Sequence, residues 1–419
     1  MREMKDSGIE WIGAIPAAWG VHRIASHFQE IKEKNTDNAY SSALQFKMGR
    51  IIAKPQKWDE DETNETYSAY TVVHPNTIMI NGLNLEFDFV TQRVARVECD
   101  GIITSAYIAL SPRDDINAKY ICYLFKSYDA CRAFHSMGRG LRKILSYSEL
   151  KNKPIVIPPL AEQERIAAFL DAECAEIDAV LEKTRASIEE YKKLKQAVIT
   201  QAVTKGIRGD RPMKDSGIEW IGEIPAEWDV LNLVAHTSML TPMRDRPENL
   251  DGPIPWIRIE DFEGKYIESS KAGLGVSMKT VKEMNLKVYP VGTILCTSSC
   301  IMGKCAIVSR ELVSNQRFIG IIPDRTTDKT YLYYLMTSNA ERMNFLSTGA
   351  LQANLSRSAF EHLKVQFPPY SEQQEIAAYL DDKCEKIDEL ILKKQQYLTE
   401  IENYKKSLIY EYVTGKREV

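Results

Sequence analysis

The feature that most constrains this chain is an internal duplication. Residues 4–19 read MKDSGIEWIGAIPAAW and residues 213–228 read MKDSGIEWIGEIPAEW, so fourteen of sixteen positions are identical at an offset of 209. A second matched pair follows at an offset of 210, with PPLAEQERIAAFLDAECAEIDAVLEK starting at Pro158 and PPYSEQQEIAAYLDDKCEKIDELILK starting at Pro368. A solenoid requires shorter and more numerous repeats. The duplication therefore predicts a two-lobed molecule with a pseudo-twofold axis.

The stretches between the matched blocks do not resemble each other in sequence. We call residues 20–157 the first lobe and residues 229–367 the second lobe. A chain of 419 residues is too long for one ordinary core, which agrees with several domains. The predicted domains are the first lobe with its repeat block at 1–157, a helical spacer at 158–209, the second lobe with its repeat block at 210–367 and a second helical spacer at 368–419.

Each Pro-Pro pair introduces a predicted helix. The prolines favour an extended entry, and Ser371 is a candidate N-cap with the acidic Glu372 in the first turn. Apolar positions then recur at spacings of four and three, the pattern of a coiled-coil seam. In the first copy the seam is Ile177, Leu181, Thr184, Ile188, Tyr191, Lys195, Val198 and Ala202, and in the second copy it is Ile387, Ile391, Lys394, Leu398, Ile401, Lys405, Leu408 and Tyr412.

Two such helices related by a twofold axis predict an antiparallel coiled coil. The alternative is a pair of amphipathic helices packed on separate lobes. The segment from Asp178 to Thr204 corresponds to about 40 Å of helix, which is close to one turn of duplex DNA, about 34 Å. A rod of this length with one lobe at each end suits a DNA site that has two read halves and an unread spacer.

Composition narrows the class of protein. The apolar content of 44% and the charged content of 27% are typical of a soluble globular protein, and the sequence lacks a run of 18 apolar residues that would span a membrane. The eight cysteines form no CxxC pair, which favours reduced thiols and a cytoplasmic location. Because the net charge is −4, any DNA contact must come from local basic patches.

The lobes are predicted to be mixed α/β structures, which gives an α+β fold for the whole chain. Short β-branched segments are typical of strands; they begin at Thr77, Gly101, Gly292 and Cys305.

Several motifs resemble catalytic or metal sites but lack required groups. Phe367-Pro-Pro-Tyr370 is similar to the Asp/Asn-Pro-Pro-Tyr/Phe motif of amino-methyltransferases, but Phe367 cannot accept a hydrogen bond from a target amino group. Cys296, Cys300 and Cys305 are too widely spaced for a typical zinc site. We find no Gly-rich cofactor loop or Walker-type loop. The sequence therefore predicts a binding protein without catalytic residues, metal or cofactor.

The repeated motifs resemble those of type I restriction-modification specificity subunits. The opening MKDSGIEWIG with its following Ile-Pro and Trp is similar to the start of each half in that family, and Pro158–Asp171 and Pro368–Asp381 are similar to its helical regions. The resemblance implies two target recognition domains that read an asymmetric bipartite site in double-stranded DNA. It also implies two modification subunits that bind S-adenosylmethionine and methylate adenine N6, and two restriction subunits that use ATP and Mg.

The strongest DNA-binding candidate in the first lobe is the Gly-rich basic stretch before Pro158, and a polar stretch lies at the corresponding place in the second lobe. Arginine can bind guanine bidentately, and Asn or Gln can bind adenine. The alternative is a solvated turn. The strong candidates are Gly138, Arg139, Gly140, Arg142 and Lys143 in the first lobe and Gly349, Gln352, Asn354 and Arg357 in the second; weaker ones are Asn81, Asn84, Arg93, Lys304 and Arg317.

Two alternatives to a specificity subunit stay open at this point. The first is a coiled-coil scaffold that assembles modification subunits without reading DNA. The second is a methyltransferase with a degenerate motif. Matched helices suit identical partners on each side, and unlike lobes suit two different DNA half-sites.

Overall fold

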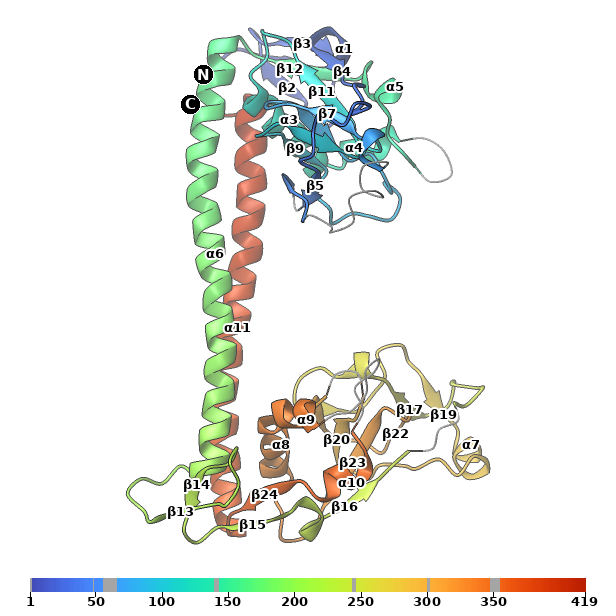
Figure 1. Cartoon of the computed structure of the whole chain (residues 1–419), viewed down its shortest axis with the longest axis vertical. Coiled ribbons are helices and arrows are strands. Elements are labelled where there is room, and N and C mark those ends of the chain that lie inside the picture. Colours follow the sequence, from blue (N-terminus) through green and yellow to red (C-terminus); the bar gives the residue numbers. More distant parts are fainter. Residues whose placement is uncertain are drawn as a thin grey trace. The chain divides into compact units, whose positions relative to one another are not determined.

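The computed structural model describes residues 2–47, 49–55, 66–138, 143–242, 246–299, 302–346 and 355–419. The chain forms two compact units (Figure 1). The first contains residues 1–185 together with 396–419, and the second contains residues 186–395. Each unit therefore holds one lobe, one part of each long helix and one copy of the N-terminal repeat.

The first unit is built on a four-stranded antiparallel sheet of order β4-β11-β8-β9. Its strands bury Ile78, Ile80, Val94 and Leu110 in one core with helix α3. The elements are β1 (Met4–Asp6), β2 (Ala14–Pro16), β3 (Gly20–Arg23), α1 (Ile24–His27), β4 (Phe28–Glu30), β5 (Leu44–Lys47), β6 (Arg50–Ala53), β7 (Thr71–Val73), β8 (Ile78–Ile80), β9 (Val94–Arg96), β10 (Gly101–Ile103), β11 (Ile108–Pro112), α3 (Ala118–Ala130), α4 (Ala133–Met137), α5 (Tyr147–Leu150), β12 (Pro154–Ile157) and the start of α6 (Leu160–Lys205).

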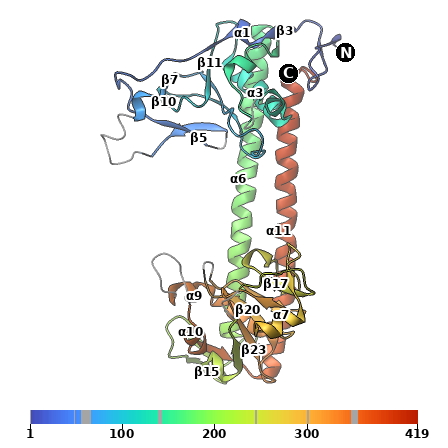
Figure 2. The same ribbon diagram turned by 90° about the vertical axis from the view of Figure 1, so that its right-hand side faces the viewer.

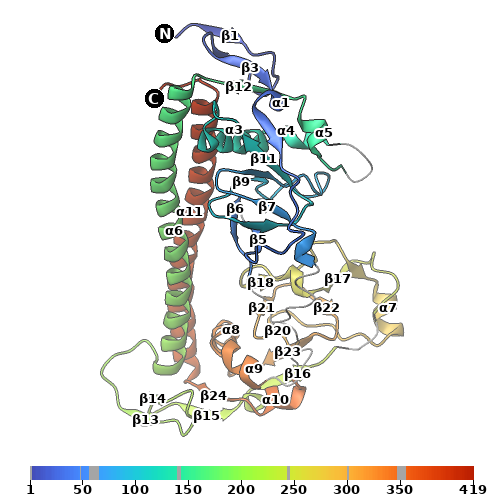
Figure 3. The same cartoon turned by 45° about the horizontal axis from the view of Figure 1, so that its top comes forward.

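Three smaller strand pairs complete the first lobe, and all three are antiparallel. They are β3 with β12, β5 with β6, and β7 with β10. Figure 3 shows the β5–β6 hairpin beside β7 and β9. The hairpin β1–β2 of the N-terminal repeat packs its isoleucines and Trp19 against Leu408, Tyr412 and Val413 near the end of α11.

The second unit has a five-stranded sheet of order β16-β23-β20-β21-β18. Its core joins Ile294, Ile307 and Ile321 to helix α8. The elements are β13 (Met213–Asp215), β14 (Glu223–Pro225), β15 (Asp229–Asn232), η1 (Leu233–Ala235), β16 (Thr237–Leu240), β17 (Ile254–Ile257), η2 (Ile259–Asp261), β18 (Tyr266–Ile267), β19 (Gly275–Val276), α7 (Met278–Glu283), β20 (Ile294–Thr297), β21 (Cys305–Val308), β22 (Val313–Ser314), β23 (Phe318–Pro323), α8 (Lys329–Ser338), α9 (Ala340–Leu346), α10 (Arg357–Glu361), β24 (Lys364–Phe367) and α11 (Tyr370–Val413).

The two lobes share a frame that their sequences do not reveal. Strands β4, β11, β8 and β9 of the first lobe occupy the same sheet order as β16, β23, β20 and β21 of the second, with antiparallel pairing throughout. The strand β12 pairs with β3 as β24 pairs with β15. The predicted α+β class is confirmed, and the four β-branched segments form β8, β10, β20 and β21.

Helices α6 and α11 run antiparallel within each unit. In the first unit Phe169 packs on Tyr412 with ring centroids 4.5 Å apart, and Lys405 Nζ lies 2.6 Å from Asp178. In the second unit Lys195 Nζ lies 2.6 Å from Asp388. Leu181, Thr184, Ile188 and Ala202 of the predicted seam are buried. The predicted antiparallel coiled coil is confirmed, and each copy is one continuous helix from its Pro-Pro pair onward.

The predicted cap at Ser371 is wrong. Helix α11 begins at Tyr370, one residue earlier, because the carbonyl of Pro369 accepts hydrogen bonds from the amides of Glu372 and Gln373. The same pattern joins Pro159 to Glu162 and Gln163 in the first copy. The proline carbonyl therefore starts both helices, and no hydroxyl cap is needed, which is consistent with Ala161 at the corresponding position.

Candidate nucleic-acid interface

The repeated residues attach each lobe to its helix. Trp19 is fully buried, and its indole Nε1 donates to Glu162 Oε2 at 3.0 Å; Arg2 pairs with the same carboxylate at 2.6 Å. In the second unit Trp228 donates to Glu372 at 3.0 Å and Arg211 lies 2.6 Å from it. We call each arrangement the Trp–Glu clasp. It explains why the repeat couples a tryptophan to a glutamate about 144 residues later.

The glutamine after each glutamate holds the N-terminus of α3 in the first lobe and of α8 in the second. Gln163 Oε1 accepts from the backbone amide of Asn117 at 2.8 Å, and Asn117 caps α3 by accepting from Lys119 and Tyr120. Gln373 likewise accepts from Asp328 at 2.9 Å, which caps α8. Figure 2 shows α3 beside α6. The cap of the lobe helix and the start of the long helix are thus fixed by one side chain.

A third repeated contact lies two turns further along each long helix. Tyr123 donates to Asp171 at 2.9 Å, with Lys119 Nζ 2.6 Å away. Tyr334 donates to Asp381 at 2.7 Å, with Lys265 Nζ 2.5 Å away. Burial raises the pKa of both tyrosines, so each hydroxyl stays protonated and donates. The sequence comparison missed this pair because α3 and α8 share only scattered positions, chiefly a Tyr-x-x-Tyr-Leu pattern.

In the first lobe two predicted DNA-binding segments lie side by side. The amide of Leu85 donates to the carbonyl of Lys143, and the amide of Leu145 donates to the carbonyl of Gly82. A Cβ at Gly82 would lie 2.2 Å from the Leu145 carbonyl oxygen, so only glycine permits this approach. The β8–β9 connection (residues 81–93) therefore lies against residues 143–145, at the described end of the predicted basic stretch. Gly82 was not predicted, although an isolated Gly after a strand signals such an approach.

Arg93 requires a correction, because it is buried rather than exposed to DNA. Its side chain is fully buried, and its guanidinium donates to the carbonyls of Leu83 and Asp88 at 2.6 Å each and to that of Asn81 at 3.1 Å. A guanidinium bonded to carbonyls of its own loop is not available to a guanine edge. Arg93 therefore organises the β8–β9 connection instead of contacting bases.

The other first-lobe candidates divide into four groups. Asn84 and Lys143 are exposed, and Asn84 adopts a left-handed φ of 52°. The side chain of Asn81 accepts from the amide of Leu83 at 3.1 Å, so its oxygen supports the loop. Gly138 ends α4, and a Cβ there would lie 2.7 Å from Leu85 Cδ1. Arg139, Gly140 and Arg142 lie outside the described residues.

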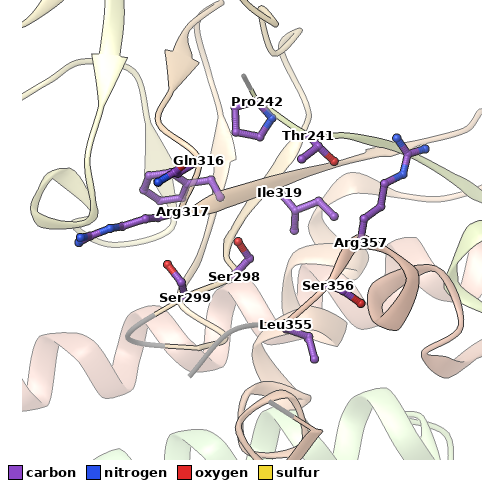
Figure 4. A pocket seen from close by; sticks show the side chains of 11 residues that line it. Thr241, Pro242, Ser298, Ser299, Gln316, Arg317, Ile319, Leu355, Ser356 and Arg357 are labelled. Carbon is purple, nitrogen blue, oxygen red and sulfur yellow. The ribbon is translucent and has the colours of Figure 1, made fainter. Parts of the chain in front are cut away.

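The second lobe forms a cavity of about 580 Å³ at the equivalent place. The amide of Leu355 donates to the carbonyl of Ser298, and the amide of Ser298 donates to the carbonyl of Arg317. These bonds join the β20–β21 connection (residues 298–304) to two neighbouring segments, as in the first lobe. Figure 4 shows the cavity. Its lining consists of Thr241, Pro242, Ser298, Ser299, Gln316, Arg317, Phe318, Ile319, Leu355, Ser356 and Arg357.

Two predicted arginines border this cavity. Figure 4 shows Arg317 and Arg357 extending from opposite sides. Both are exposed; Arg357 pairs with Glu361 at 2.7 Å in the first turn of α10. Lys304 is exposed at the end of the β20–β21 connection, where its backbone pairs with Thr297. Gly349, Gln352 and Asn354 lie outside the described residues.

The motifs that resemble catalytic or metal sites have structural roles in the fold. Phe367 is buried at the end of β24, directly before the Pro-Pro pair that starts α11. Cys296 and Cys305 face each other across β20 and β21 and are buried. Among the described residues, His, Cys, Asp and Glu form no group of three or more that could hold a metal. The same residues contain no helix long and apolar enough to cross a membrane.

Comparisons with known proteins agree with this geometry. A family model described as the type I restriction modification DNA specificity domain matches residues 100–190 and 229–403, more than half of the chain. The type I restriction enzyme MjaIX specificity subunit of Methanocaldococcus jannaschii is 36% identical over 176 residues, which cover 39% of this chain and 40% of that subunit. The putative MjaX specificity subunit of the same organism is 24% identical over 97% of this chain and 96% of its own length.

A solved structure supports the fold. A chain from a study of complex assembly and conformational transition of the type I R-M system is similar with a TM-score of 0.74 and 14% sequence identity. The match covers 96% of this chain and 99% of the solved one. At this identity the likeness concerns the fold alone.

Proposed function

The chain belongs to the type I restriction-modification DNA specificity family, and we propose on that premise that its two lobes read the two halves of one asymmetric DNA site. The predicted resemblance of the chain to this family is confirmed. Members supply DNA sequence specificity and are not catalytic, so the scaffold without readout is not favoured. The predicted domain boundaries remain part of the proposal.

One observation carries the proposal of two different half-sites. The sheet order, the capped helix (α3 or α8) and the Trp–Glu clasp are equivalent in both lobes. The connections β8–β9 and β20–β21, in contrast, differ in length, and the surfaces around them differ in charge and shape. In the first lobe this surface holds Asn84 and Lys143. In the second it is a cavity bordered by Arg317 and Arg357. Arginine suits bidentate contact with guanine, and lysine suits phosphate.

The proposed DNA contacts are the exposed candidates among the described residues, together with the predicted candidates that lie outside them. In the first lobe we propose Asn84, Lys143 and the basic stretch that contains Gly138, Arg139, Gly140 and Arg142, with Asn81 and Arg93 holding the loop. In the second lobe we propose Arg317, Arg357 and Lys304, with Gly349, Gln352 and Asn354 on the neighbouring segment.

The long helices are proposed to dock two modification subunits. Large apolar side chains that remain exposed on a helix pair favour a further partner. They are Leu160, Val180 and Leu194 on α6 and Tyr370, Tyr379, Leu390, Leu392, Tyr397 and Tyr404 on α11. The modification subunits would bind S-adenosylmethionine, and two restriction subunits with ATP and Mg would complete the enzyme. We place this assembly in the cytoplasm.

The proposal is tested by co-expressing the full chain with its cognate modification subunit and mapping methylated adenines across the genome. We expect one bipartite motif with an unread spacer. Replacing residues 20–157 with the corresponding lobe of another family member should change one half of the motif and leave the other. A soluble complex that contains S-adenosylmethionine but methylates no site would contradict the proposal.

A further inference from the structure

The tip of the β8–β9 connection presents apolar side chains to solvent. Within residues 84–92, Phe87 is 78% exposed, Phe89 is 54% exposed and Val90 is 93% exposed. Single exposed apolar residues are common, but a group of three on one short connection marks a binding surface. We call residues 84–92 the apolar tip.

The backbone of the apolar tip is fixed from within. Besides the carbonyls held by Arg93, the carboxylate of Asp88 accepts from the amides of Val90 and Thr91 at 3.1 and 2.9 Å. The hydrogen bonds from Thr91 lower the pKa of Asp88, so this carboxylate stays ionised near neutral pH. A loop ordered before binding loses little entropy when its partner arrives. The exposed rings are therefore presented by a rigid support.

The surroundings of the apolar tip suit a polyanion. The Phe89 ring stacks on His135 with centroids 5.2 Å apart, and the Arg132 guanidinium lies 5.1 Å above the same ring. Lys143, which is exposed, accepts the backbone hydrogen bond of Leu85. The chain between Gly138 and Lys143 adds Arg139 and Arg142 in sequence. Two acids, Glu86 and Asp88, belong to the tip, and the carboxylate of Asp88 is occupied as described.

We propose that Phe87 and Val90 act as an apolar wedge that enters a groove of the first half-site and unstacks one base step. This inference rests on the proposed function, because the tip is continuous with the proposed DNA surface. Proteins that kink DNA insert such side chains between base steps, and flanking basic residues hold the phosphates. Among the described residues of the β20–β21 connection in the second lobe, the one large apolar side chain, Met302, is buried.

The experiment uses the full chain in complex with its cognate modification subunits and its mapped DNA site. Duplexes carry 2-aminopurine at successive positions of the first half-site. We expect the fluorescence of one position to rise on binding. The double variant Phe87→Ser, Val90→Ser should abolish this rise and weaken binding by about ten- to a hundredfold. The slope of affinity against salt should not change, because no phosphate contact is lost.

Two further variants keep this result interpretable. Phe87→Leu with Val90→Ile retains apolar surface and should retain most of the affinity. Val291→Ser removes an apolar side chain that is 58% exposed in the turn before β20, at the opposite end of that strand from the connection, and should have no effect. Equal loss in the apolar and the serine double variants would overturn the wedge.

The remaining outcomes separate this inference from the proposed function. A wild-type complex that recognises no bipartite site contradicts the proposed function itself. If the wild type binds and the serine variant binds equally well with the same fluorescence, the wedge is wrong. If the serine variant fails to co-purify with the modification subunit, the tip is a protein-docking surface and the wedge is also wrong.

Discussion

The two lobes use one frame and differ where that frame meets its ligand. Their sheets share a strand order, and α3 and α8 are capped and attached to the long helices through equivalent side chains. The connection after β8 runs from 81 to 93 and is closed by a buried arginine, whereas that after β20 runs from 298 to 304 and borders a cavity. Attachment and readout therefore occupy different residues. A reading surface can change without disturbing how the lobe is held.

The two Trp–Glu clasps also differ, although their sequences are repeated. The Glu372 side chain is 2% exposed and that of Glu162 is 13% exposed, and the partner arginines are 12% and 26% exposed. A charge pair excluded from water depends more strongly on both partners. We therefore expect a substitution in the Trp–Glu clasp of the second lobe to destabilise its unit more than the same substitution in the first.

The largest expected effect tests this difference. Glu372→Ala leaves the buried Trp228 indole without its acceptor and leaves Arg211 with the exposed Glu227 as its remaining carboxylate partner, which should lower the local stability of the second unit by about 3 kcal/mol. Glu162→Ala should cost less, about 1–3 kcal/mol, because Arg2 reaches more solvent. Hydrogen exchange of peptides 213–228 and 4–19 measures each clasp separately. Equal protection loss in both variants would show that burial does not distinguish them.

The second prediction tests whether Arg93 stabilises the β8–β9 connection, a role that belongs to the first lobe. Arg93→Ala leaves buried carbonyls without donors, so we expect a loss of about 2–3 kcal/mol and rapid proteolysis within residues 81–93. Arg93→Lys restores the charge but not the fork of donors, and should rescue only partly. The control is Arg96→Ala, whose guanidinium pairs near the surface with Asn76 and Glu98. Limited proteolysis with mass spectrometry locates the cleavage, and unaltered cleavage in Arg93→Ala would contradict the role.

The sequence predicted the parts of the fold that rest on periodicity and duplication. Spacings of four and three identified the coiled-coil seam, and the prolines located the start of both long helices to within two residues. The equivalence of the lobes could not be predicted, because sheet order depends on pairing between distant strands, and such pairing leaves little trace in local pattern.

The sequence indicated where candidate residues lie better than it indicated what their side chains do. The candidates in the β8–β9 connection and the basic stretch were chosen separately for their polar and basic side chains, and a backbone hydrogen bond from Leu85 brings Lys143 beside that connection. Composition alone does not distinguish an exposed arginine from a buried one, so Arg93 was assigned to DNA although its own loop binds it. The Trp–Glu clasp was missed because each partner lies in a different matched block.

The third prediction concerns DNA affinity in the second lobe. Arg317→Ala should weaken binding to the cognate site by about 1–3 kcal/mol and relax specificity in one half of the motif only. Lys304→Ala should weaken cognate and unrelated DNA alike and reduce the salt slope by about one. Fluorescence anisotropy over a series of salt concentrations measures both effects. If Arg317→Ala lowers affinity equally for all sequences, its contact is with phosphate.

The smallest effect is expected for the reactivity of the cysteines. One lies on the surface of the first lobe, and two lie in the core of the second. Cys99 is exposed in the first lobe, whereas Cys296 and Cys305 are buried in the second. Burial raises the pKa of Cys296 well above its ordinary value, so its thiol stays protonated in the folded chain at pH 8. Because the thiolate is the reactive form, iodoacetamide should label Cys99 within minutes and leave Cys296 intact.

The same burial of Cys296 sets the sign with which the free energy of unfolding depends on pH. An unfolded cysteine ionises near its ordinary pKa of about 8.5, while folded Cys296 does not, so its contribution to stability is complete below that pH and decreases as pH rises. Peptide mapping after native labelling at pH 8 and pH 9.5 tests this. Labelling of Cys296 at the rate of Cys99 would mean that the sheet β20–β21 opens, and the second lobe would then lack the rigid frame on which the comparison of the two reading surfaces depends.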